Sequence, residues 1–95
     1  MNLRWDARAL QDLRDIRSYI AAHGSPAAAD HIRQHLRARV VRLLTNPAIG
    51  VATTNRQIRI LPPTRYPYRI YYAVLGDDVV ILHIRHTARS APEDL

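Results

Sequence analysis

The spacing of apolar residues changes along this chain from a helical period to a strand period. Residues 7–23 and 26–45 carry apolar side chains at every third or fourth position, which predicts two amphipathic helices. Asp6 is placed to cap the first helix, Gly24 to end it in a left-handed conformation, and Ser25-Pro26 to start the second. Such a short connection predicts an antiparallel helical hairpin whose apolar faces share one partner.

Strands are predicted on both sides of this hairpin. Asn2 to Trp5 alternates polar and apolar residues, which fits a short first strand. Beyond a loop over residues 47–55, three further strands are expected over residues 57–61, 68–74 and 79–86. This order predicts an α+β fold: an N-terminal strand, an α-helical hairpin, then a three-stranded antiparallel β-meander with the helices on one sheet face.

Size and composition limit the class of protein. Ninety-five residues, 47% of them hydrophobic, fit a single domain over residues 1–95. The sequence has no apolar run of membrane-spanning length, no cysteine and no N-terminal basic segment followed by an apolar stretch. We therefore expect a cytoplasmic protein without disulfides and without a membrane partner.

The charge of the chain points to a polyanionic partner. Its formal net charge is +6, and all fourteen of its lysine and arginine residues are arginine. A genome rich in G and C would explain the missing lysines but not the net charge. The planar guanidinium suits phosphate and carboxylate, so the candidate partners are nucleic acid, a ribosomal surface or an acidic protein.

The turn at Gly76-Asp77 sets which residues oppose each other in the last hairpin. With an even loop, Leu75 opposes Asp78 and, further out, Arg69 opposes Ile84. The face expected in the core then carries Ile70, Tyr72, Val74, Val79 and Ile81.

The opposite face of this hairpin holds the candidate chemistry. It gathers Arg69, Tyr71, Ala73 and His86. Arg59 of the preceding strand joins them if Ile58 and Ile60 point inward. An odd loop would put Arg85 beside Arg69 in place of His86, so the site depends on one residue of register.

Motifs spread over nearly the whole chain resemble a known family. They are an early helix with Trp5, Ala9, Leu10, Leu13, Ile16, Tyr19 and Ile20, a second helix closing on Asn46-Pro47, the strand Tyr68-Arg69-Ile70-Tyr71-Tyr72, and Ile81 to His86 with a trailing Arg89. Their order and spacing resemble the RelE/ParE superfamily of bacterial type II toxins. The resemblance implies a growth-arresting toxin, neutralised by a cognate antitoxin that wraps an acidic and apolar segment over it.

The family divides into RelE-like members, which cleave mRNA in the ribosomal decoding site without a metal, and ParE-like members, which poison DNA gyrase. Cleavage needs a base for the 2′-hydroxyl proton, an acid for the leaving oxygen and cations on the phosphate. If this chain is a nuclease, the resemblance implies a catalytic set of Arg69 at the scissile phosphate, Arg59 on the preceding strand, and His86 as acid or base. Candidates for contacting the target or RNA are Tyr71, which could stack on a base, Arg85 and Arg89.

A departure from the nuclease pattern and two likenesses to ParE favour the ParE branch. RelE-like chains usually extend further and bring a C-terminal tyrosine or histidine into the site, whereas this sequence ends in Ser90-Ala91-Pro92-Glu93-Asp94-Leu95. ParE-like chains also share two features with this one: long helices joined by a tight turn, and an apolar last strand that runs into His86-Thr87-Ala88-Arg89. We expect a gyrase inhibitor that is not an enzyme. The alternatives are a ribosome-dependent endoribonuclease, and an inactive toxin or basic interaction module.

Simpler interpretations stay open for these residues. Arg59 and Arg69 could be solubilising charge on an exposed sheet surface, and His86 could be a hydrogen-bonded structural histidine. The sequence also has no P-loop, dinucleotide-binding fingerprint, Cys/His zinc cluster or base-reading helix-turn-helix. No cofactor and no metal are therefore expected.

The second predicted helix carries a further group of basic residues. His31 and His35 lie one turn apart, a spacing that can bind a metal, but no third ligand is evident nearby. The arginines of this helix are Arg33, Arg37, Arg39 and Arg42. They could approach nucleic acid or an acidic antitoxin, or form a solvated helix face.

Overall fold

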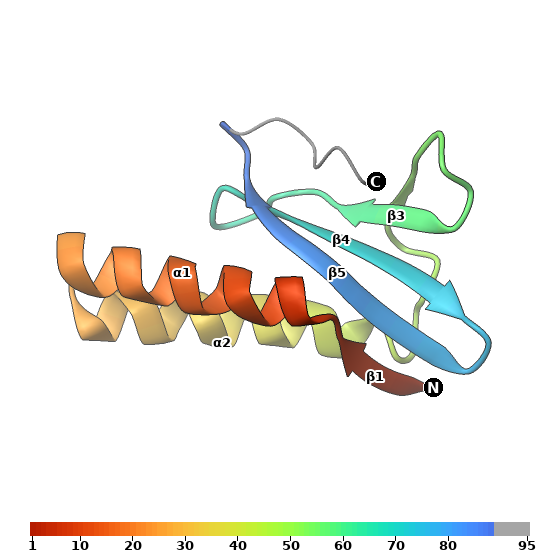
Figure 1. Cartoon of the computed structure of the whole chain (residues 1–95), viewed down its shortest axis with the longest axis horizontal. Coiled ribbons are helices and arrows are strands. Elements are labelled where there is room, and N and C mark those ends of the chain that lie inside the picture. Colours follow the sequence, from red (N-terminus) through yellow and green to blue (C-terminus); the bar gives the residue numbers. More distant parts are fainter. Residues whose placement is uncertain (89–95) are drawn as a thin grey trace.

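The computed structural model describes residues 1–88, and in it a helical hairpin covers one face of a five-stranded sheet (Figure 1). In chain order the elements are β1 (Asn2–Trp5), α1 (Ala7–His23), α2 (Pro26–Arg42), β2 (Val51–Ala52), β3 (Ile58–Leu61), β4 (Tyr68–Leu75) and β5 (Asp78–His86). This arrangement confirms the predicted α+β fold. The two-residue strand β2 was not predicted.

The ends of the helices follow from their capping residues. The Asp6 side chain accepts a hydrogen bond from the backbone N–H of Arg8, and the Ser25 hydroxyl oxygen accepts one from that of Ala28. Gly24 ends α1 at a φ of −131°, so the left-handed conformation predicted for it is wrong. Its N–H instead donates to the carbonyl oxygen of Ile20, which closes the last turn.

The sheet order is β1-β5-β4-β3-β2. The β3-β4-β5 meander is antiparallel, as predicted, and β2 adds a short antiparallel pair at its edge. The first strand pairs in parallel with β5, from Asn2 opposite Asp78 to Trp5 opposite Ile81. The N-terminal strand thus covers only the first half of the edge of β5.

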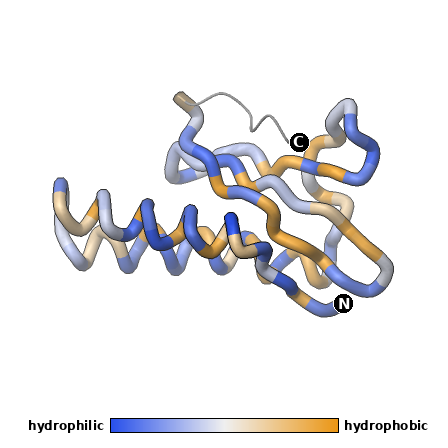
Figure 2. Tube along the Cα trace, viewed as in Figure 1, coloured by the Kyte–Doolittle hydropathy of each residue, from blue (hydrophilic) through white to orange (hydrophobic). Residues whose placement is uncertain are grey.

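The hydrophobic core lies between the helices and the sheet. Figure 2 shows apolar residues along the centre of β5 and toward the turn end of β4, and polar residues along much of the helices. The core residues from the helices and the turn after α2 are Ala9, Ile32, Leu36, Val40 and Leu43, and those from the sheet are Leu61, Tyr68, Ile70, Tyr72, Val79, Ile81 and Ile84. Val74 was also expected in the core, but it lies next to the turn and is 37% exposed.

A β-bulge changes the register of the β4-β5 hairpin halfway along its length. Pairing follows the prediction from Leu75 opposite Asp78 to Tyr72 opposite Ile81. Beyond that point Tyr71 opposes His83, because β5 contains one additional residue, Leu82. Every pair further from the turn is therefore shifted by one residue.

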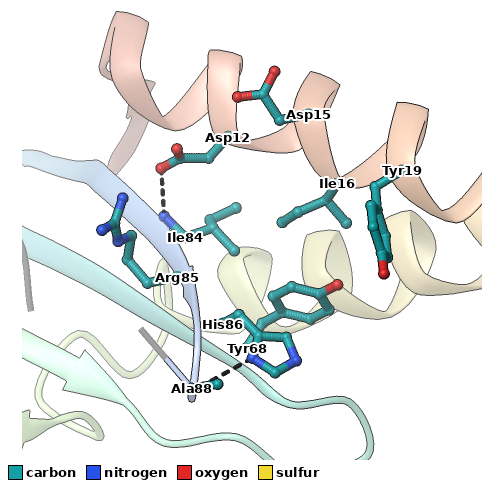
Figure 3. A pocket seen from close by; sticks show the side chains of 9 residues that line it. All are labelled: Asp12, Asp15, Ile16, Tyr19, Tyr68, Ile84, Arg85, His86 and Ala88. Atoms are coloured by element: carbon teal, nitrogen blue, oxygen red, sulfur yellow. Dashed lines mark hydrogen bonds between the residues drawn. The ribbon is translucent and has the colours of Figure 1, made fainter. Parts of the chain in front are cut away.

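The edge of β5 beyond the bulge is covered by α1. The Asp12 Oδ2 accepts a hydrogen bond of 2.9 Å from the N–H of Ile84 (Figure 3) and lies 3.5 Å from Nδ1 of His83. The Asp12 carboxylate thus pairs with a backbone amide on the part of the strand edge that β1 does not reach. Over residues 1–88, neither helix is long and apolar enough to cross a membrane.

Tyr72 fastens the loop before β2 to the core. Its hydroxyl donates a hydrogen bond to the carbonyl oxygen of Pro47 and accepts one from the N–H of Gly50, each 2.8 Å long. Burial raises the pKa of this hydroxyl above its ordinary value of 10.0, against smaller lowering effects of the Gly50 hydrogen bond and the Arg59 charge. The folded state therefore favours the neutral phenol.

We expect alkaline pH to destabilise the fold through Tyr72. The unfolded chain loses this proton near its ordinary pKa of 10.0, whereas the folded chain retains it to higher pH. The free energy of unfolding should then fall as pH rises above 10 and stop falling only above the folded pKa. Urea denaturation from about pH 8 to about pH 11 measures this slope. Tyr72→Phe should flatten it, whereas Tyr19→Phe, at a position 60% exposed, should leave it unchanged.

Candidate functional site

Two arginines oppose each other directly on the sheet face that points away from the helices. The shifted register places Arg69 of β4 opposite Arg85 of β5. Directly opposed residues on neighbouring strands have Cβ atoms about 5 Å apart, so the two side chains start from adjacent points. Both are half-buried. The bulge thus creates a cationic pair, which we call the arginine pair.

Few contacts within the described chain compensate this charge. Nη1 of Arg69 donates a hydrogen bond of 3.4 Å to the carbonyl oxygen of Thr87. The buried Nε of Arg85 has no hydrogen-bond partner among residues 1–88, and no carboxylate there forms an ion pair with either arginine. Like charges directly opposite each other destabilise a sheet. Two arginines that start from adjacent points and have no carboxylate ion-pair partner within residues 1–88 are suited to bind an anionic group.

The arginine pair borders an apolar sheet surface. On the same face, Ile58, Tyr71, Ala73 and Val80 are each at most 7% exposed. Since Tyr71 itself is 5% exposed, its ring is not presented for stacking in this structure, and its proposed contact with a base stays a prediction. The site therefore consists of a cationic end and an apolar floor.

His86 does not belong to this site, so the predicted neighbourhood of His86 and Arg69 is wrong. The bulge turns His86 to the helix side, opposite Tyr68, with the two ring centroids 5.5 Å apart and nearly perpendicular. The His86 Nδ1 accepts a hydrogen bond of 3.0 Å from the N–H of Ala88 (Figure 3). These contacts support the interpretation of His86 as a structural histidine.

Arg59 also lies elsewhere. It opposes Tyr72, and Ile58 opposes Ala73, so Arg59 faces the helix side and the two isoleucines of β3 face outward. The condition under which Arg59 would join the outer face is therefore not met. The Arg59 Nη1 donates to the carbonyl oxygens of Gly50 (2.8 Å) and Ala48 (3.4 Å), which fixes the loop before β2. Its contacts are those of a structural residue.

A cavity of about 540 Å³ between α1 and the end of β5 was not predicted from the sequence. Figure 3 shows Asp12, Asp15 and Tyr19 on its α1 wall and Arg85 and His86 on its β5 wall. Asp12 lies off the apolar stripe of its helix, and a carboxylate that faces a strand edge leaves no pattern in the spacing of residues. Only the three-dimensional arrangement reveals the contact between Asp12 and the edge of β5.

The remaining sequence predictions concern Arg89 and metal ligands. Arg89 lies outside the described residues. Among residues 1–88, no three His, Cys, Asp or Glu side chains are grouped so that they could hold a metal ion. His31 and His35 are both on α2, and within residues 1–88 only the His35 side chain of the two makes a hydrogen bond, to Thr64. This pair is considered again below.

Comparison with known proteins places the chain in a family. A family model described as the ParE toxin of the type II toxin-antitoxin system parDE matches residues 3–91. Toxin RelE2 of Caulobacter vibrioides is 38% identical over 87 residues, which cover 90% of this chain and 93% of that protein.

Two solved structures share the fold. A chain of the chromosomal ParDE system from P. aeruginosa superposes with a TM-score of 0.81 at 26% identity, covering 90% of this chain and 95% of that one. The isolated E. coli RelE toxin gives a TM-score of 0.70 at 22% identity, covering 94% and 86% respectively, which is a likeness of fold. With the match of the family model over residues 3–91, these findings show that this chain belongs to the ParE toxins of type II toxin-antitoxin systems, within the RelE/ParE superfamily.

Proposed function

We propose that this toxin arrests growth by binding DNA gyrase in the cytoplasm, and that it uses the arginine pair to hold an acidic group of the target. The observation that carries the proposal is the separation of His86 from the arginine pair by the β-bulge. Cleavage of RNA requires a group that accepts a proton and one that donates it, beside the cations that hold the phosphate. Guanidinium groups stay protonated at neutral pH, so the arginines supply only charge.

The arginine pair supports a binding role, because arginine is common among the residues that anchor protein interfaces. Tyr71, Ala73 and Val80 beside the pair are at most 7% exposed, so in this structure they support the pair from within the sheet and are not themselves a contact surface. Membership of a type II family implies a cognate antitoxin as a second partner. A neutralising antitoxin would compete with the target if it covers this surface.

Ribosome-dependent cleavage of mRNA is the second candidate. The relative named toxin RelE2 and the suitability of two arginines for a phosphate favour it. The weak point of the nuclease candidate is the group that would transfer the proton. His83 opposes Tyr71, next to the pair, but its Nδ1 lies 3.5 Å from Asp12 of α1.

Induction of this chain without an antitoxin in a bacterial host tests the proposal. Gyrase-dependent DNA breaks and mRNA ends are mapped in the same culture, and purified toxin is added to a gyrase supercoiling reaction. We expect DNA breaks, intact mRNA and inhibited supercoiling. Cleaved mRNA on ribosomes with normal supercoiling would replace the proposal with the nuclease. Normal growth with soluble expression would leave an inactive toxin or an interaction module.

A further inference from the structure

Three arginines and two histidines lie together on the helix layer, on the other side of the sheet from the arginine pair. His31, His35, Arg39 and Arg42 follow one another on α2 at steps of four, four and three residues, which places them on one face of the helix. Arg65, from the loop between β3 and β4, lines the same pocket as His31 and His35. We call these five residues the α2 cationic stripe.

The loop between β3 and β4 is held against the helix by His35. The His35 Nε2 lies 3.2 Å from the Thr64 hydroxyl, and its ring meets the Tyr66 ring edge-on at 5.1 Å between centroids. The Arg65 guanidinium lies over the same Tyr66 ring, 5.6 Å from its centroid. These contacts explain why Arg65 is positioned beside the helix.

The pocket formed in this way has a polar and cationic lining. Its volume is about 370 Å³, and His31, Gln34, His35, Arg65 and Tyr66 line it. Imidazole, amide, guanidinium and phenol groups can all donate hydrogen bonds, and none of the five lining residues within the described part of the chain is aliphatic. Such a lining suits the oxygen atoms of an oxyanion better than the side chains of a folded protein surface.

The positive charge of the stripe is not compensated within residues 1–88, where no carboxylate forms an ion pair with any of its five members. Burial lowers the pKa of His35, and the charges of Arg39 and Arg65 lower it further. Burial and the charge of Arg42 likewise lower the pKa of Arg39. An anion bound here would offset the repulsion between these neighbouring charges.

We propose that the α2 cationic stripe binds the phosphodiester backbone of a nucleic acid. From residue 31 to residue 42 the helix rises about 16 Å, which is long enough to follow several phosphates of one strand. Arginine is well suited to bidentate contact with phosphate oxygens, and Gln34 adds a neutral donor. Because the stripe and the arginine pair lie on opposite sides of the sheet, this binding does not depend on the target of the toxin.

Fluorescence anisotropy with a labelled duplex DNA and a labelled single-stranded RNA of equal length, titrated at several salt concentrations, tests the proposal. The test variant is Arg39→Gln/Arg42→Gln/Arg65→Gln. The matched control, Arg14→Gln/Arg17→Gln/Arg56→Gln, has the same net charge and changes exposed arginines away from the stripe. We expect the test variant to lose about tenfold or more in affinity and about two to three units of salt slope on duplex DNA, and the control to change little.

The comparison between probes identifies the source of the phosphate. Tighter binding of duplex or of single strand assigns DNA or RNA, and either supports the proposal. Equal losses in the two variants would overturn it, because the effect would then be one of net charge. Binding of polyglutamate as tight as that of the nucleic acids would also overturn it, in favour of an acidic protein partner.

Two further measurements test the site if the triple variant does not fold, and test it independently of affinity. If circular dichroism shows that the triple variant is unfolded, Arg42→Gln/Arg65→Gln, at two exposed positions, should still lower the salt slope by about two. Saturating duplex should also raise the pKa of His35 in an NMR titration, because phosphates offset the charges of Arg39 and Arg65. An unchanged His35 pKa would place the nucleic acid elsewhere and overturn the assignment of this site.

Discussion

Replacing both Arg69 and Arg85 with alanine is expected to abolish growth arrest while the chain stays folded. Loss of one central arginine from a protein interface commonly costs about 2 kcal/mol, or about thirtyfold in affinity, so loss of both should weaken target binding about a thousandfold. The stability change should stay within about 1 kcal/mol, because the substitution also removes like charges that oppose each other across two strands. Growth after induction, gyrase supercoiling with purified toxin and thermal melting measure the three quantities.

The control for this experiment is Arg14→Ala/Arg17→Ala, which removes the same charge from exposed positions of α1. It should leave growth arrest intact. Full toxicity of the Arg69/Arg85 variant would remove the arginine pair from the proposed site. A double variant that is unfolded by circular dichroism would give the pair a structural role. The single variant Arg69→Ala should also fold, since the only hydrogen bond of its side chain within residues 1–88 is a long one to Thr87.

The helical half of this fold could be predicted from local signals. Asp6 and the Ser25-Pro26 pair mark where α1 and α2 begin, and both sites make the hydrogen bonds that such residues favour. The parallel pairing of β1 with β5 could not be predicted in this way. It joins residues more than seventy positions apart, and a four-residue strand gives no indication of its partner.

The register of the final hairpin was predictable only as far as its turn controls it. Gly76, at a φ of +61°, permits the tight turn, and the first pairs follow from it. The bulge comes directly after Ile81, where the pairing of β1 with β5 ends. Beyond it, Asp12 of α1 accepts a hydrogen bond from the edge of β5. The position of the bulge therefore depends on three elements that meet in space. For this reason the sequence left open whether His86 or Arg85 lies beside Arg69.

The orientation of β3 could not be predicted because both of its faces carry apolar residues. Alternation identifies the inner face of a strand only when the other face is polar. Here Leu61 is 2% exposed on the helix side, and Ile58 is 7% exposed on the outer side. Arg59 would join Arg69 only if the two isoleucines pointed inward, and they point outward. This buried outer face is also the apolar floor of the proposed site.

Tyr72→Phe is expected to give a large loss of stability although it removes a single oxygen atom. The ring of Tyr72 is fully buried, and its hydroxyl satisfies both Gly50 N–H and the Pro47 carbonyl. Without the hydroxyl, a buried donor is left unpaired, at a cost of about 2 kcal/mol. For a domain of this size we expect the melting temperature to fall by about 10 °C. Thermal denaturation followed by circular dichroism measures it.

Gly50→Ala tests the same contact from the side of the loop. A Cβ at residue 50 would lie 2.5 Å from the Tyr72 hydroxyl oxygen and 2.6 Å from its ring, so the loop must move and break the hydrogen bond. We expect a destabilisation of about 1–3 kcal/mol. Since both substitutions break one shared contact, the double variant should lose less stability than the sum of the two single losses. Additive losses, or an unchanged melting temperature in Tyr72→Phe, would contradict the role of this hydroxyl in fastening the loop.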